Sequence, residues 1–198
     1  MIELTLEQLA QGRLKALQNA IDLIEDAECL IQRERWARAN FLAHIAIEEL
    51  GKYLMLIGAI GRILHGQIDW SRFWKRFLSH AEKTRNIFDF DALLSPSVSP
   101  DEIQKVLEKS TADSEKYQEQ KMSSLYVDFE NDQFVAPTDI FDKDLANRTV
   151  EAARSVLTFF ETGEKSFFSK GDVTKISPEK FKQMVQKLFA HSEEVLWA

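Results

Sequence analysis

Residues 36–64 read WARANFLAHIAIEELGKYLMLIGAIGRIL, and this stretch decides the fold. It is long and rich in apolar residues, which gather in one sector when the stretch is wound as an α-helix. The preceding segment is similar: Thr5 and Gln8 make a capping-box sequence, and apolar residues then recur at three- and four-residue steps to about Arg33. The sequence therefore predicts two long, consecutive helices.

Four further helical patterns follow these two. They run from Asp69 or Trp70 to about Leu93, from Pro100 to about Lys121, from Asp142 to about Phe168, and from Ser177-Pro178 to the end. The Ser- and Pro-rich segment 95–100 separates the third pattern from the fourth, and Ser99-Pro100 with Glu102 supplies a helix start. Seven Gly and four Pro are few for a chain of 198 residues, which favours long helices.

One extended segment interrupts the helices. Residues 125–129 (LYVDF) alternate, residues 130–132 can turn, and residues 133–135 can return before Pro137. We therefore predict an all-α fold, a bundle of about six helices with a short hairpin or extended insertion near 124–137. We expect a single domain over 1–198.

Composition indicates an ordinary globular protein of the cytoplasm. Hydrophobic residues make up 44% of the chain and charged residues 29%, which excludes a disordered or fibrous chain. The N-terminus lacks the features of a signal peptide, and the longest nearly apolar run, 53–61, is too short to span a bilayer. We therefore expect no membrane association. The single cysteine, Cys29, cannot form an internal disulfide, and we expect a buried or half-buried thiol.

Charge is unevenly distributed along the chain. The formal net charge of −7 argues against a general nucleic-acid coat protein, because such binding depends on neutralising phosphates. Between Arg62 and Arg85, however, six Arg and Lys residues accompany only two acids. One basic segment therefore stands out from an acidic remainder.

The helix predicted over 36–64 carries an acid in its apolar sector. In a helical projection Glu49 falls in the middle of that sector, whereas Glu48 and Lys52 fall along its edge. A carboxylate in a core must be paired, protonated or bound to a ligand, because an isolated buried charge is costly. The structural alternative is an ion pair between Glu49 and an arginine of a neighbouring helix. Glu48 and Lys52, four residues apart, also suit an ordinary surface ion pair.

The next predicted helix carries a basic stripe. One sector holds Arg72, Arg76, His80 and Lys83, and the packing sector holds Trp70, Phe73, Trp74 and Phe77. Such a stripe can be simply a solvated face. The core acid on the preceding helix, however, makes a functional site a competing interpretation. In that site His80 would transfer a proton, Arg76 would hold a phosphate and Lys83 would stabilise negative charge.

We expect no metal ion and no other cofactor. His44 and Glu48 are spaced to place two ligands on one helix face, but the Glu-x-x-His motifs of di-iron bundles are absent from the sequence. The sequence also lacks a phosphate-binding glycine loop and a serine or cysteine nucleophile with a recognisable histidine and acid.

Several segments together resemble the AbiV family of bacterial abortive-infection proteins. They are AIEELGK at 46–52, FWKRFLSHAEK at 73–83, and SLYVDF at 124–129 with the Pro137 that follows. Chain length and helix order fit as well, so the resemblance spans most of the chain. It implies the HEPN superfamily, whose helical domains are commonly homodimers and often metal-independent RNases in phage defence or toxin–antitoxin systems.

The usual HEPN signature is an arginine and a histidine with four to six residues between them. In this sequence Arg76 and His80 have three residues between them, and Arg72 and His80 have seven. Arg38 and His44 have five, but they lie before the Glu-Glu motif and on different sides of a regular helix. The sequence therefore departs from the signature in the segment that carries His80.

We predict an abortive-infection effector that acts on RNA as a metal-independent endoribonuclease and arrests translation or growth. The predicted catalytic residues are Glu49, Arg76, His80 and Lys83, and the predicted substrate-binding residues are Lys52, Arg72, Lys75, Tyr126 and Asp128. We expect a cytoplasmic homodimer, with RNA as substrate and a phage-encoded activator protein as a partner. The alternatives are a non-catalytic protein that binds a phage or host protein or a nucleotide, and a purely structural bundle.

Overall fold

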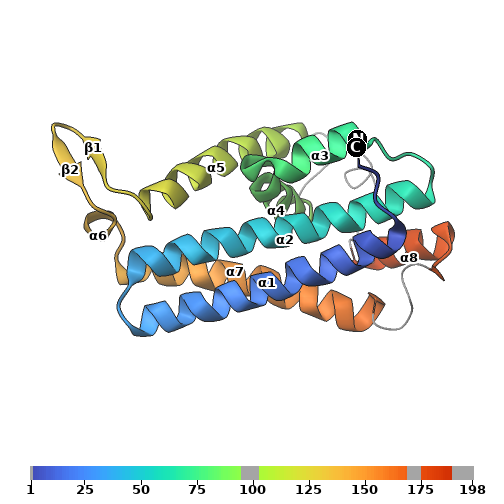
Figure 1. The fold of residues 1–198 in the computed structure, drawn as a ribbon, viewed down its shortest axis with the longest axis horizontal. Helices are drawn as coiled ribbons and strands as arrows, with labels where there is room; N and C mark the ends of the chain where they lie inside the picture. The colour runs from blue at the N-terminus through green and yellow to red at the C-terminus, as the bar shows by residue number, and fades with distance from the viewer. Residues whose placement is uncertain (1, 95–102, 169–174, 189–198) are drawn as a thin grey trace.

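The computed structural model describes residues 2–94, 103–168 and 175–188. These residues form an elongated helical bundle with one small β-hairpin at its end (Figure 1). The elements are α1 (Leu6–Gln32), α2 (Trp36–Leu64), α3 (Trp70–Leu78), α4 (His80–Leu94), α5 (Ile103–Ser123), β1 (Asp128–Glu130), β2 (Gln133–Val135), α6 (Pro137–Ile140), α7 (Lys143–Gly163), a π-helical turn (Glu164–Phe168) and α8 (Pro178–Leu188). The predicted all-α fold with a short insertion is confirmed.

The pair α1–α2 lies at the centre of the bundle. The predicted capping box is present at its start: the Thr5 hydroxyl accepts from the Gln8 amide at 3.2 Å, and Gln8 Oε1 accepts from the Thr5 amide at 2.9 Å. α1 and α2 lie side by side along most of their length (Figure 1). Both bury alanines, which allow the close approach: Ala16, Ala20 and Ala27 on α1, and Ala39, Ala43 and Ala46 on α2.

The other helices cover different sides of this pair. α7 packs against α1 and α2, whereas α4 and α5 pack on α2 (Figure 1). A buried ionic group ties α1 and α2 to the end of α7: Glu164 pairs with Arg13 and accepts a hydrogen bond from the Tyr53 hydroxyl at 2.8 Å. The core therefore lies mainly where α2 meets α1, α4 and α7.

The helix predicted from about Asp69 to Leu93 is two helices. Ser79 adopts an extended backbone conformation (φ −79°, ψ 125°), which ends α3 before α4 begins. The Ser79 hydroxyl accepts a hydrogen bond from the Glu82 amide at 3.3 Å and so caps the first turn of α4. The prediction of one continuous helix was wrong. Because of this break, two members of the basic stripe lie on α3 and two on α4.

The predicted hairpin near 124–137 is confirmed. β1 and β2 pair antiparallel, with Phe129 opposite Phe134. Asn131 and Asp132 have φ of 49° and 64°, the left-handed conformation that both central residues of a type I′ turn require. The turn residues, and not a long loop, therefore set the register of the strands.

The smaller expectations have different outcomes. Cys29 is exposed and not half-buried, because it lies on the solvent side of α1, two residues after the buried Ala27. The predicted helix start at Ser99-Pro100 with Glu102 lies outside the described residues, and so does the last helix beyond residue 188. The remaining predicted boundaries agree with the structure to within a few residues, except at Ser79.

Candidate functional site

Glu48 is the buried acid of α2. Its side chain is 4% exposed, and it faces α4 and α5. Asn40 and His44, two turns and one turn earlier on the same helix, are fully buried as well. The side of α2 that carries these three residues is therefore a polar strip inside the bundle.

Four polar side chains converge on the Glu48 carboxylate. Its Oε2 atom lies 2.6 Å from His80 Nδ1 and 3.6 Å from Lys83 Nζ, both on α4. Its Oε1 atom pairs with the Lys121 ammonium and lies 3.4 Å from Gln118 Nε2, both on α5. These five residues are called the Glu48 cluster below, and they join three helices through one carboxylate.

The charge state of Glu48 follows from these contacts. Burial raises the pKa of its carboxyl, but the hydrogen bonds from Lys121 and His80 and the charges of these two groups together lower it further, so the pKa lies below its ordinary value. Glu48 is therefore ionised at neutral pH and can only accept hydrogen bonds. It follows that His80 Nδ1 carries the proton in the contact between the two side chains.

His80 combines a fixed orientation with access to solvent. Its side chain is 64% exposed although Nδ1 is held by the buried carboxylate. The other ring nitrogen, Nε2, is then unprotonated in the neutral imidazole and available to a ligand. A carboxylate that orients a histidine in this way is the arrangement of a general base in many hydrolases.

Lys83 contributes a buried cation beside His80. Burial lowers the pKa of its ammonium, the Glu48 carboxylate opposes this shift, and the nearby Lys52 adds to it. Lys83 can come this close to α2 because residue 51 is glycine: a Cβ on Gly51 would overlap the Lys83 carbonyl oxygen. The Glu-Glu-Leu-Gly-Lys motif at 48–52 thus supplies both the buried acid and the gap into which α4 packs.

Glu49 and Lys52 lie at the edge of this arrangement. The two side chains form an ion pair with each other and line a pocket of about 470 Å³ together with Phe77 and residues of α1. The prediction that Glu49 is the core acid and that Glu48 borders it was wrong. Leu56 of the predicted apolar face lies against Gly12 of α1, and Tyr53 packs on Phe160 of α7, whereas α4 and α5 bury a second side of α2.

The α3 members of the basic stripe do not reach Glu48. Arg76 donates from Nε to Glu82 at 3.0 Å and from Nη2 to Asn86 at 2.9 Å, so its guanidinium is turned along α4. Arg72 and Lys75 are exposed on α3. Burial, then the charges of Arg76 and Arg72, lowers the pKa of Arg62 at the end of α2. The guanidinium groups of Arg62, Arg72 and Arg76 are therefore near one another, between the end of α2 and α3.

Tyr126 and Asp128 lie apart from the Glu48 cluster. Both are exposed, and they belong to the hairpin end of the bundle, whereas α3 lies toward the other end (Figure 1). Asp128 Oδ1 accepts a hydrogen bond from the Phe129 amide at 2.8 Å. Within one chain, the structure does not bring these two predicted residues to His80.

The Arg38–His44 pair, which has the usual HEPN spacing, is also separated. His44 is fully buried against the ring of Tyr117, with ring centroids 3.8 Å apart. Burial and the charge of Lys121 lower the pKa of His44 to about 3, so it is neutral at physiological pH. Arg38 is exposed and donates to the Leu125 carbonyl at 3.4 Å. These positions do not suit a shared catalytic role.

Sequence reasoning missed the contribution of α5. Lys121 and Gln118 reach Glu48 from more than sixty positions further along the chain, and Gln118 Nε2 also donates to Thr84 Oγ1 at 3.0 Å. No local pattern separates Lys121 from the exposed Lys109 and Lys116 of the same helix. Only the packing of α5 on α2 identifies it.

A family model described as AbiV, within the HEPN class, matches residues 8–158. The chain belongs to the AbiV family. This membership makes it an abortive-infection protein of the HEPN type, and the matched range includes every residue of the Glu48 cluster. Comparison with curated proteins and with solved structures gave no match.

Two further features of this AbiV-family chain concern possible ligands. Among the described residues, no three His, Cys, Asp or Glu side chains are grouped so that they could hold a metal ion. Over the same residues, no helix has the length and apolar character needed to cross a membrane.

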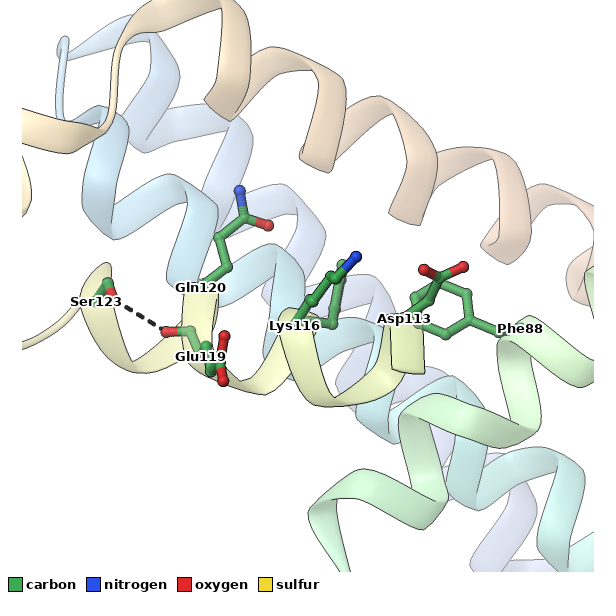
Figure 2. Close-up of a pocket in the computed structure, with 7 residues that line it drawn as sticks. Phe88, Asp113, Lys116, Glu119, Gln120 and Ser123 are labelled. Atoms are coloured by element: carbon green, nitrogen blue, oxygen red, sulfur yellow. Dashed lines mark hydrogen bonds between the residues drawn. The ribbon is translucent and has the colours of Figure 1, made fainter. Parts of the chain in front are cut away.

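A second hollow lies on α5 and contains none of the predicted site residues. It has a volume of about 550 Å³ and is lined by Phe88, Asp113, Lys116, Tyr117, Glu119, Gln120 and Ser123. Figure 2 shows Asp113, Lys116 and Gln120 extending from the same side of α5, and the Ser123 hydroxyl donates to the Glu119 carbonyl at 3.1 Å. This hollow is open and of mixed charge, so the Glu48 cluster remains the stronger candidate site.

Proposed function

We propose that this AbiV-family protein is a metal-independent endoribonuclease that arrests translation or growth during phage infection. The observation that carries the proposal is the exposed imidazole of His80, held at Nδ1 by the buried, ionised Glu48. Family membership supplies the context of abortive infection. The proposal places Glu48, and not the predicted Glu49, as the acid beside His80 and Lys83.

In the proposed reaction, His80 Nε2 takes the proton of a ribose 2′-hydroxyl. The 2′-oxygen attacks the adjacent phosphorus, the bond from phosphorus to the 5′-oxygen breaks, and that oxygen takes a proton from the imidazolium or from water. The products are a 2′,3′-cyclic phosphate and a 5′-hydroxyl end. No metal ion or cofactor is needed to balance this reaction.

The cations near His80 suit the charge that develops on the phosphate. Lys83 and His80 share the Oε2 atom of Glu48, and removing an electrostatic contact from an active site costs about 10²–10³-fold in rate. Arg72 and Lys75, exposed on α3, would contact the phosphates of the same strand. Arg76 pairs with Glu82, so its proposed role is to hold α3 against α4 and thereby shape this surface.

The proposal extends to the setting of the reaction. We propose a cytoplasmic homodimer that acts on cellular RNA and is switched on by a phage-encoded protein. Sedimentation of the purified full chain would test the dimer, and co-expression with phage genes would test the activator.

The direct test compares wild type with His80→Ala, each purified from phage-infected cells so that the activator has been present, on total cellular RNA in the presence of EDTA. We expect wild type to release fragments with 2′,3′-cyclic phosphate and 5′-hydroxyl ends, and His80→Ala to be slower by about 10²–10⁴-fold, the usual contribution of a general base. His65→Ala, at an exposed histidine just after α2, is the matched control and should cleave normally. Growth arrest by wild type without any cleavage of RNA would contradict the proposal.

A further inference from the structure

The hairpin end of the molecule exposes an unusual amount of apolar surface. Nine large hydrophobic side chains are exposed among the described residues, and six of them fall between residues 122 and 140. These six, called the hairpin patch below, are Met122, Tyr126, Val127, Phe129, Phe134 and Ile140. A concentration of this kind, in contrast to scattered exposed residues, is typical of an interaction surface.

The two phenylalanines are the most prominent part of the hairpin patch. Phe129 is 57% exposed and Phe134 is 78% exposed, and their rings meet edge to face with centroids 5.1 Å apart. As directly opposed residues they project from the same face of the hairpin. The hairpin stands out from the end of the bundle (Figure 1), so a partner could approach the rings without moving a helix.

Charge indicates which kind of partner fits. Residues 122–140 contain four acids, Asp128, Glu130, Asp132 and Asp139, and no Lys or Arg. All four acids are exposed. The exposed Arg38 borders this segment at Leu125, but the four acids outnumber it. RNA and anionic lipid surfaces would therefore be disfavoured, whereas an apolar protein surface bordered by Lys and Arg would be attracted.

We propose that the hairpin patch is the docking surface for a basic segment of another protein. Phe129 and Phe134 would enter an apolar pocket of that partner, and the acids of the hairpin would pair with its Lys and Arg residues. Tyr126 and Asp128, first predicted to contact RNA, then serve this protein contact. α3, which carries Arg72 and Lys75, lies away from the hairpin (Figure 1), so docking leaves this basic helix open to a substrate.

A photo-crosslinking experiment tests this proposal independently of the proposed nuclease activity. The photoreactive amino acid p-benzoylphenylalanine replaces Phe134 in the full-length His80→Ala protein, which is irradiated in growing and in phage-infected cells. We expect an adduct with one other protein, mapped by mass spectrometry to a segment with net positive charge and apolar residues. Adducts only with RNA, only with a second copy of this chain or only with lipid would overturn the proposal, and so would the absence of any adduct.

Binding of the mapped segment as a synthetic peptide then tests the contacts. We expect Phe129→Ala to weaken binding by about 30-fold or more, as for a central aromatic contact. Glu130→Gln should weaken it by a smaller factor that disappears at high salt. Glu25→Gln, at an exposed acid of α1, is the matched control and should leave binding unchanged. Equal weakening by Glu25→Gln and Glu130→Gln would show nonspecific attraction and overturn the proposal.

Discussion

Replacing Glu48 by glutamine should be among the most damaging single changes in the chain. The substitution keeps the shape of the side chain but removes its charge. Lys83 and Lys121, each about 5% exposed, would then be buried without the carboxylate that they share. Breaking a buried ion pair by removing one partner costs about 3–5 kcal/mol, because the remaining charge is left uncompensated.

Urea unfolding at pH 7, followed by circular dichroism, measures this loss. With a slope of about 2 kcal/mol per M, the loss lowers the urea midpoint by about 2 M. Glu49→Gln is the matched control, since Glu49 lies at the edge of the site and pairs with Lys52, and it should cost at most about 1 kcal/mol. Lys121→Met added to Glu48→Gln should restore part of the loss, because it removes one of the uncompensated cations.

The difference between wild type and Glu48→Gln should also depend on pH. The pKa of Glu48 is below 4.5 in the folded state, so its contribution is complete above pH 4.5 and is lost as the pH falls through the folded-state value. The two proteins should therefore converge in acid. Equal losses for Glu48→Gln and Glu49→Gln at pH 7, or no convergence in acid, would refute this view of the cluster.

Three other predictions concern buried contacts of α2. Gly51→Ala should destabilise the fold by about 1–3 kcal/mol, because its Cβ would overlap the Lys83 carbonyl oxygen. Gly58→Ala is the control: a Cβ at Gly58 meets open space, so this change should raise stability by about 0.5–1 kcal/mol. Thermal unfolding of the two variants measures the difference. Because the pKa of His44 is lowered from 6.5 to about 3, wild type should lose stability as the pH falls through that range, and His44→Phe should show a shallower loss in acid titration. Tyr53→Phe should cost about 1.5–3 kcal/mol in urea unfolding, because it removes a hydrogen bond to the Glu164 carboxylate, and an unchanged midpoint would contradict that role.

The helices could be predicted from the sequence because each has a strong local signal. The capping box at Thr5, the apolar pattern of α2 and the turn residues before Gln133 all act over a few residues, and the structure confirms them. The break at Ser79 also has a local signal, since Ser79-His80-Ala81-Glu82 is itself a capping-box pattern. The apolar spacing across this break stays helical and conceals it.

The site was harder to predict for two reasons. α2 is buried on several sides, so apolar residues alone could not choose between Glu48 and Glu49, which point about 100° apart on a helix. The second difficulty is distance along the chain: Lys121 reaches Glu48 only because α5 packs across α2. His80 and Lys83 were predicted correctly as neighbours, because both lie within one turn of the same helix.

The proposed chemistry requires that Glu48 holds His80 with its Nδ1 protonated and its Nε2 available. Nitrogen-15 NMR of the imidazole, on protein labelled at histidine, measures this directly. We expect neutral His80 to be mainly the Nδ1-protonated tautomer, and Glu48→Gln to shift it toward the Nε2-protonated tautomer usually favoured in water. A mainly Nε2-protonated His80 in wild type, or the same tautomer in both proteins, would contradict the claim.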